Sequence, residues 1–132
     1  MPRQLWFSLE DLWQVRQVTA RWAVEAGLPV RRAMDLVIAV HEIAANAVVH
    51  GSVRARLTVR ITPGKDIAAA ITDEGRWRPS AAGADGQRCG GFEGMGLPLA
   101  RQVCDAVVVQ AGNGGTTVTL QMRLPSSQVP GT

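Results

Sequence analysis

Residues 30–50 limit the possible folds of this chain more than any other segment, because they form a helical pattern that is apolar around most of its circumference. At about 100° per residue, this helix carries two apolar stripes. The stripe that we expect to face the core holds Met34, Val37, Ile38, Ala45 and Val48. The stripe on the far side holds Leu36, Val40, Ile43, Ala44 and Ala47. A helix that is apolar nearly all round is stable only when it is buried, so other elements must cover it.

Four polar residues share one side of this helix. Asp35, Glu42, Asn46 and His50 fall within roughly 80° of one another. A structural hydrogen-bond network could satisfy them, but four on one stripe favour a cavity, since buried polar groups without partners cost a few kcal/mol each. Glu42 and Asn46 are about 6 Å apart along the axis, so a carboxamide oxygen can hold Mg²⁺ while the carboxylate faces a neighbouring reactive oxygen or water. His41 points into the first apolar stripe, and we interpret it as a core histidine whose hydrogen bonds are satisfied.

The remaining pattern predicts a layer of helices on one face of a sheet. Ser8 can cap a helix that Gly27 ends. Two strands joined at Pro63 and Gly64 follow, and the second of them, residues 66–72, is apolar on both sides and therefore central. The later elements are a helix over 97–105 and strands over 106–110 and 116–124. We therefore expect an α/β (α+β) two-layer sandwich with a mixed, mainly antiparallel sheet, as a single domain over residues 1–125 with a flexible tail, 126–132.

The outer face of the predicted sheet is polar and basic. It would carry Arg54, Arg56, Arg60, Thr117, Thr119, Gln121 and Arg123. Two interpretations remain open here, a solvated sheet face and a surface that binds a partner.

Composition excludes several classes of protein. Fourteen Lys and Arg against eleven Asp and Glu give a formal net charge of +3, which is too small to indicate a nucleic-acid partner. Lys65 is the only lysine and no Ser or Thr follows it, which excludes the GxxxxGK[ST] phosphate loop. No apolar run reaches the about 18 residues of a membrane span, and acidic Glu10 and Asp11 follow soon after the first residue. We expect a cytoplasmic protein that binds no membrane.

The cysteines indicate neither a disulfide nor a metal site. Cys89 and Cys104 form no CxxC pair, and their spacing to the two histidines matches no usual zinc pattern. We interpret both as reduced thiols.

Glycine is concentrated in one region. Six of the fourteen glycines fall within residues 83–96, and residues 76–93 show neither helical nor strand periodicity, which is typical of a lid or binding loop. Glycines just before a helix present backbone N–H groups and the positive end of the helix dipole to phosphates. Upstream, Asp73 at a strand end can accept a hydrogen bond from an exocyclic amine such as that of adenine, and Gly75 lets the backbone approach a flat ring.

Taken in order, these motifs resemble those of the GHKL ATPase (Bergerat) fold, the histidine kinase-like ATPase domain. The motifs are Glu42-x-x-x-Asn46-Ala47-x-x-His50-Gly51, Asp73-x-Gly75, Gly94-x-Gly96-Leu97 and Gly115-Thr116-Thr117. The nearest branch resembles the small bacterial anti-sigma factor serine/threonine kinases. The resemblance covers nearly the whole chain and implies a short first strand at about residues 3–7.

The resemblance also implies roles for individual residues. Asn46 would ligate the Mg²⁺ that bridges the ATP phosphates, and Glu42 would be the base toward the substrate hydroxyl. Asp73 would bind the adenine amino group, with Thr116 near the same ring edge. The other expected nucleotide-binding residues are His50, Gly75, Gly94, Gly96 and Leu97. Residues 76–93 would form the ATP lid, where Arg78 or Arg88 is either the cation that meets a terminal phosphate or a solvated loop charge.

Three functions are compatible with these residues. The first is a Mg-ATP-dependent protein serine/threonine kinase that phosphorylates a STAS-domain anti-sigma antagonist, sequesters a sigma factor and forms a homodimer, as the resemblance implies. The second is a nucleotide-dependent protein-binding module, with ATP or ADP bound but no useful phosphotransfer. The third is an α/β domain with a structural polar helix and no nucleotide.

Overall fold

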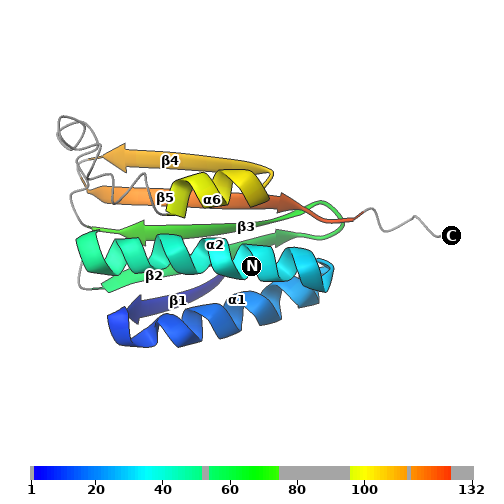
Figure 1. Ribbon diagram of the computed structural model, residues 1–132, viewed down its shortest axis with the longest axis horizontal. Helices are drawn as coiled ribbons and strands as arrows, with labels where there is room; N and C mark the ends of the chain where they lie inside the picture. Colours follow the sequence, from blue (N-terminus) through cyan, green and yellow to red (C-terminus); the bar gives the residue numbers. More distant parts are fainter. Residues whose placement is uncertain (1, 52–53, 75–95, 113, 126–132) are drawn as a thin grey trace, which may run out of the picture.

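One face of a five-stranded antiparallel sheet is covered by helices (Figure 1). The computed structural model describes residues 2–51, 54–74, 96–112 and 114–125. The strands are β1 (Arg3–Ser8), β2 (Arg54–Thr62), β3 (Asp66–Asp73), β4 (Ala106–Gly112) and β5 (Gly115–Arg123). The helical segments are η1 (Leu9–Asp11), α1 (Leu12–Ala26), α2 (Val30–Asn46), η2 (Ala47–Gly51) and α6 (Gly96–Val103). This architecture confirms the predicted two-layer sandwich.

The strand order is β1-β2-β3-β5-β4, which puts β3 at the centre as its doubly apolar sequence predicts. Every pairing among these strands is antiparallel. Ile71 of β3 lies between Leu57 of β2 and Val118 of β5, and all three side chains are buried beneath the helices. Their neighbours along each strand point to the opposite face, because side chains alternate along a strand.

The ends of α1 follow local chemistry that the sequence predicts. The backbone N–H of Ser8 donates to Asp11 Oδ2 at 3.0 Å in a capping box that opens η1. Gly27 ends α1 with φ at 109°, and its N–H donates to the Val24 carbonyl at 3.0 Å. A glycine adopts this left-handed conformation without strain, which explains why the helix ends there.

The far apolar stripe of α2 is buried, whereas the stripe that the sequence led us to assign to the core is buried only in part, with Val37 at 6% exposure. Leu36, Val40 and Ile43 of the far stripe are fully buried in the core. Met34 and Ile38 of the stripe that the sequence led us to assign to the core are each 48% exposed, so that prediction was wrong for these two residues. A helix in a single layer turns one side to the sheet and leaves its outer side to solvent, and α2 lies beside α1 and α6 rather than beneath a second layer (Figure 1).

His41 belongs to the same outer side, which corrects its assignment as a core residue. It is only partly buried, and Arg16 Nη1 of α1 lies 3.3 Å from its Nδ1. The contact joins α1 to α2 at the surface of the helix layer.

The last turns of α2 depart from the single helix that the sequence predicts. The α-helix ends at Asn46, and residues Ala47–Gly51 continue it as wider π-type turns. Such turns are rare and are found mostly at functional sites. The widening begins immediately after one of the predicted ligands.

Arg32 and Asp105 connect α2 to the far edge of the sheet. Arg32 donates to Asp105 Oδ2 at 3.0 Å and to the Val103 carbonyl at 3.2 Å. The backbone N–H of Arg123 donates to the same carboxylate at 2.6 Å. Arg32 and Asp105 together therefore connect α2, the end of α6 and β5.

We expect Asp105 to make the stability of the fold depend on acidity. The Arg123 N–H bond, and then the charge and hydrogen bond of Arg32, hold the pKa of Asp105 below its usual value. A lowered pKa means that the ionised form stabilises the folded state, so this contribution is present above about pH 4 and is lost as the pH falls through the folded-state pKa. Asp105→Asn should lower the free energy of unfolding at pH 7 by about 1 kcal/mol, because the site is partly screened by solvent.

Urea unfolding at neutral and acid pH measures this difference, which should shrink at acid pH. The control is Glu25→Gln, which breaks the more exposed ion pair with Arg3 and should have a smaller effect at either pH. A loss that is the same at both pH values would contradict the role given to the Asp105 charge.

Candidate functional site

Polar side chains are rare in the core, and most of them are residues that the sequence singled out. In the described ranges, the buried polar or charged residues are Thr19, Asn46, Asp73 and Thr116. The last three are predicted nucleotide ligands. Asn46 comes from α2, and Asp73 and Thr116 are paired in the register of β3 and β5.

Asp73 and Thr116 form a cross-strand pair on the helix-covered side of the sheet. Asp73 is the last residue of β3, and the register places it opposite Thr116 near the start of β5. They continue the buried rows that contain Ile71 and Val118, and they are 3% and 2% exposed. The η2 segment contacts β3 at this level. A carboxylate and a hydroxyl therefore lie at the boundary between the sheet and the last turns of α2.

Asn46 is the last residue of α2 and lies where the π-type turns begin. It is 6% exposed, and its Nδ2 has no hydrogen-bond partner in the part of the chain that the structure describes. A buried amide left without a partner costs about 1–3 kcal/mol. Such a group is a candidate for contact with a ligand, a water molecule or an ion.

Glu42 lies one turn before Asn46 on the same helix and is only partly buried. The carboxylate can therefore exchange protons with a molecule that enters from solvent, while Asn46 lies deeper. The roles that the sequence suggests for this pair stay predictions.

The start of α6 lies toward the same end of the molecule as the end of β3 and the end of α2 (Figure 1). Gly96 is the first residue of α6, and Leu97 is 1% exposed in its first turn. Leu97 therefore anchors the helix in the core and fixes the direction of its N-terminus. The backbone N–H groups there can face an anion.

Several predicted site residues lie outside what the structure describes. These are Gly75, Gly94, Arg78, Arg88, Cys89 and the side chain of His50. Their roles stay predictions, as does the lid assigned to residues 76–93.

Gly115 is a site feature whose physical role the sequence did not disclose. It has φ at 138°, and a Cβ built on it would overlap the Asp73 carbonyl oxygen. Glycine is therefore required for β5 to approach the end of β3 and to place Thr116 opposite Asp73. A glycine that opens a strand after a turn was the available signal, but only the register shows what it touches.

The described acidic, histidine and cysteine side chains indicate neither a metal site nor a reactive thiol. No group of three or more His, Cys, Asp or Glu in the described ranges could hold a metal ion. Cys104 is a free, buried cysteine, and burial raises the pKa of its thiol to about 11. The thiol is protonated at neutral pH and is a poor nucleophile.

A family model, the histidine kinase-like ATPase domain, matches residues 5–122. The chain belongs to this family. The match includes Glu42, Asn46, Asp73 and Thr116, and it confirms the resemblance inferred from the motifs. In the described ranges of this ATPase domain, no helix combines the length and apolar character of a membrane span.

Two solved structures share the fold of this histidine kinase-like domain. The RsbU and RsbW domains of Rv1364c from Mycobacterium tuberculosis match with a TM-score of 0.70 and 23% identity, over 96% of this chain and 34% of that one. The histidine kinase domain of a blue-light activated histidine kinase from Erythrobacter litoralis EL346 matches with a TM-score of 0.58 and 20% identity, over 92% of this chain and 63% of that one. The chain thus spans about a third of the first structure and less than two thirds of the second.

We expect Gly115→Ala to destabilise the ATPase domain by about 2 kcal/mol or more, because the new Cβ needs both an unfavourable φ and the space of a backbone carbonyl. The matched control is Gly112→Ala, at the residue paired with Gly115 in the register, where a Cβ meets nothing within 4 Å. Urea unfolding of both variants measures the difference. Equal losses would show that the close approach to Asp73 does not require glycine.

We expect Asn46→Leu to leave the stability of the free domain unchanged or to raise it by about 1 kcal/mol, because the substitution removes a buried nitrogen that has no hydrogen-bond partner among the described residues. The matched control is Thr19→Val, which removes a buried hydroxyl of α1 that likewise has no partner in the described part of the chain. Thermal unfolding without nucleotide measures both. A loss of several kcal/mol for Asn46→Leu alone would mean that Asn46 has a structural role instead.

Proposed function

We propose that this chain is an ATP-binding anti-sigma regulatory factor with Mg-ATP-dependent serine/threonine protein kinase activity. Its substrate would be a STAS-domain anti-sigma antagonist, and it would sequester a sigma factor. The observation that supports this most directly is the burial of Asn46, Asp73 and Thr116, with an Asn46 Nδ2 that has no hydrogen-bond partner within the described ranges. The RsbW domain among the structural neighbours supports the anti-sigma branch.

The buried pair at the end of β3 suits the adenine end of ATP. An ionised carboxylate only accepts hydrogen bonds, so Asp73 would accept one from the adenine amino group. The Thr116 hydroxyl, opposite in the register, would contact the same ring edge as donor or acceptor. Specificity for adenine follows, because a base with a carbonyl at that position would face a carboxylate with no proton to donate.

The end of α2 suits the phosphate end of ATP. Asn46 would offer Mg²⁺ its side-chain oxygen, a hard ligand of the kind that Mg²⁺ prefers, from a buried position at the end of α2. No acidic cluster accompanies it among the described residues, as is usual for Mg²⁺ held largely by phosphate oxygens and water. Bound Mg²⁺ would neutralise the charge that develops on the transferred phosphoryl group.

Glu42 would act on the protein substrate. As the substrate serine or threonine oxygen forms a bond to the γ-phosphorus, the bond from that phosphorus to the β–γ bridging oxygen breaks and ADP leaves with the electron pair. Glu42 would take the hydroxyl proton. Its partial exposure is what a protein substrate requires, since the hydroxyl arrives from outside the domain.

One observation favours the second candidate, a nucleotide-dependent binding module. The only lysine, Lys65, lies in the turn between β2 and β3, at the opposite end of the sheet from Asp73. The terminal phosphate of ATP therefore has no lysine, and transfer depends more heavily on the remaining charges. Binding without transfer would then set affinity for a partner.

We expect calorimetry to show binding of Mg-ATP and Mg-ADP to the wild type and at least about tenfold weaker binding to Asn46→Ala. With a STAS-domain anti-sigma antagonist as substrate, Glu42→Ala should bind ATP normally but lower phosphate transfer by about 10²–10⁴. The control is Glu25→Ala, which removes a carboxylate near the end of α1, away from the candidate site. It should match the wild type in both measurements.

The results separate the candidates. Nucleotide binding without transfer by the wild type would support the module and exclude the kinase. Failure of ATP at saturating concentration to raise the melting temperature would exclude both, because a ligand that binds the folded state must stabilise it.

A further inference from the structure

The sheet face that none of the described helices covers has a distinct chemistry of its own. We call it the open face; α1, α2 and α6 all lie on the other side of the sheet (Figure 1). Because side chains alternate along each strand, the strand neighbours of the buried core residues define it. Small side chains of the central strands occupy its middle: Thr58, Ala68, Ala70, Thr72, Thr117 and Thr119. The middle of this face is therefore flat.

Positive charge dominates this open face. The described strands place four arginines on it, Arg54, Arg56, Arg60 and Arg123, against one carboxylate, Asp66. Arg54, Arg56 and Arg60 lie on β2 at spacings of two and four residues, so their side chains form a line along one strand. The single carboxylate is already engaged, since Gln121 Nε2 donates to Asp66 Oδ2 at 3.0 Å.

An exposed tryptophan orders part of this line. Trp6 of β1, opposite Arg56 in the register, is 47% exposed. The guanidinium carbons of Arg54 and Arg56 lie 4.5 and 5.3 Å from its ring centroid. Stacking on an aromatic ring fixes the plane of a guanidinium group and leaves the N–H groups at its edge available to acceptors. The buried Nε of Arg56 has no hydrogen-bond partner in the described ranges. These guanidinium groups are preorganised to bind carboxylates in pairs of hydrogen bonds.

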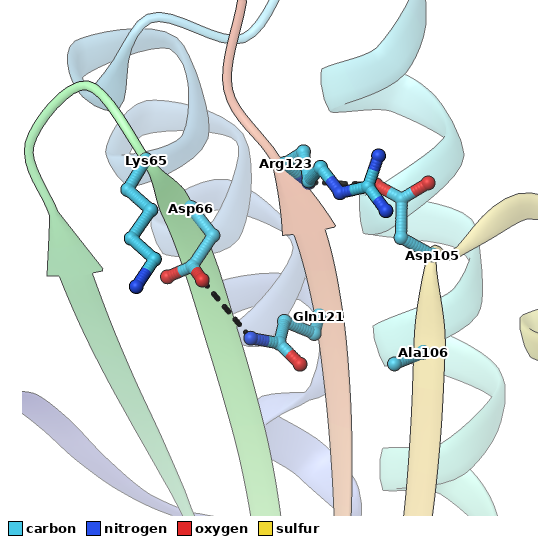
Figure 2. Close-up of a pocket in the computed structure, with 6 residues that line it drawn as sticks. All are labelled: Lys65, Asp66, Asp105, Ala106, Gln121 and Arg123. Atoms are coloured by element: carbon cyan, nitrogen blue, oxygen red, sulfur yellow. Dashed lines mark hydrogen bonds between the residues drawn. The ribbon is translucent and has the colours of Figure 1, made fainter.

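A hollow of about 190 Å³ continues the open face toward the β2–β3 turn (Figure 2). Its lining residues are Lys65, Asp66, Asp105, Ala106, Gln121 and Arg123. The register connects it to the arginine line, because Arg60 pairs with Ala68, Ala68 with Gln121, and Gln121 with Ala106. Both carboxylates of the hollow already accept hydrogen bonds, whereas the Lys65 amine adds a further positive charge.

We infer that the open face docks an acidic segment of a partner protein, with carboxylates bound along Arg56 and Arg60 and in the hollow beside Lys65. A second copy of this chain is a poorer occupant, because a two-fold contact would set the same arginines against one another. Single-stranded nucleic acid is also poorer, since stacking of a base on Trp6 would compete with the Arg54 and Arg56 guanidinium groups that already lie over its ring.

This docking surface is separate from the nucleotide site proposed above. Asp73 and Thr116 point to the helices, whereas their neighbours Thr72 and Thr117 are joined by a 3.0 Å hydrogen bond on the open face. The sheet thus separates the two surfaces, and the domain can bind a nucleotide and a partner protein at the same time.

Poly-L-glutamate is the probe, titrated at low ionic strength into the ¹⁵N-labelled domain. We expect amide shifts to change on β1, β2 and the β2–β3 turn, and binding to weaken at least about tenfold in R54E/R56E/R60E. The matched control is R21E/R31E/R101E, which makes the same change in net charge on exposed arginines of the helix layer and should bind within about threefold of the wild type. Arg60→Ala removes only one exposed side chain and should weaken binding measurably. This single variant keeps the test available if the triple variant does not fold.

Several results would overturn the inference. If both triple variants weakened binding of poly-L-glutamate equally, the effect would be one of net charge alone. Amide shift changes confined to the helix layer would place the binding site there. Tighter binding of single-stranded oligothymidylate than of poly-L-glutamate would assign the face to nucleic acid. A dimer in analytical ultracentrifugation that R54E/R56E/R60E alone dissociates would assign it to a second copy.

Discussion

Burial of α2 against the central strands is the interaction on which the rest of the structure depends. Leu36, Val40 and Ile43 contribute fully buried side chains to the core beneath the helix layer. Because these residues recur at three and four positions, the same packing fixes the rotation of the helix about its axis. That rotation buries Asn46 and leaves Glu42 only partly buried. The packing of α2 therefore also positions two residues of the candidate site.

The candidate site consists of departures from regular structure that the core holds in place. The helix widens to π-type turns after Asn46, β5 opens on a glycine with positive φ, and polar side chains replace apolar ones in buried rows. Each departure costs stability, and an extensive apolar core offsets it. This distribution is expected where selection favours ligand binding over the most stable packing.

A single sheet gives the domain two chemically different faces. Its helix-covered side carries Asp73 and Thr116 among apolar residues, and its open side carries arginines around a flat, small-residue centre. Alternation along β3 is enough to put Asp73 on one face and Thr72 on the other. A nucleotide and a partner protein therefore need not compete for space, and any coupling between them would have to pass through the strands themselves.

The sequence by itself determined the parts of this protein that depend on near neighbours along the chain. Capping at Ser8 and Gly27, alternation in β2, the doubly apolar β3 and the order of the Glu42, Asn46, Asp73 and Thr116 motifs all follow from local spacing, and they were enough to predict the fold and the family. Tertiary structure alone decided which apolar stripe of α2 is buried, where His41 points, how α2 ends and why residue 115 must be glycine. Spacing along a helix gives the angle between two side chains, but what each side chain meets depends on elements that are distant in the sequence.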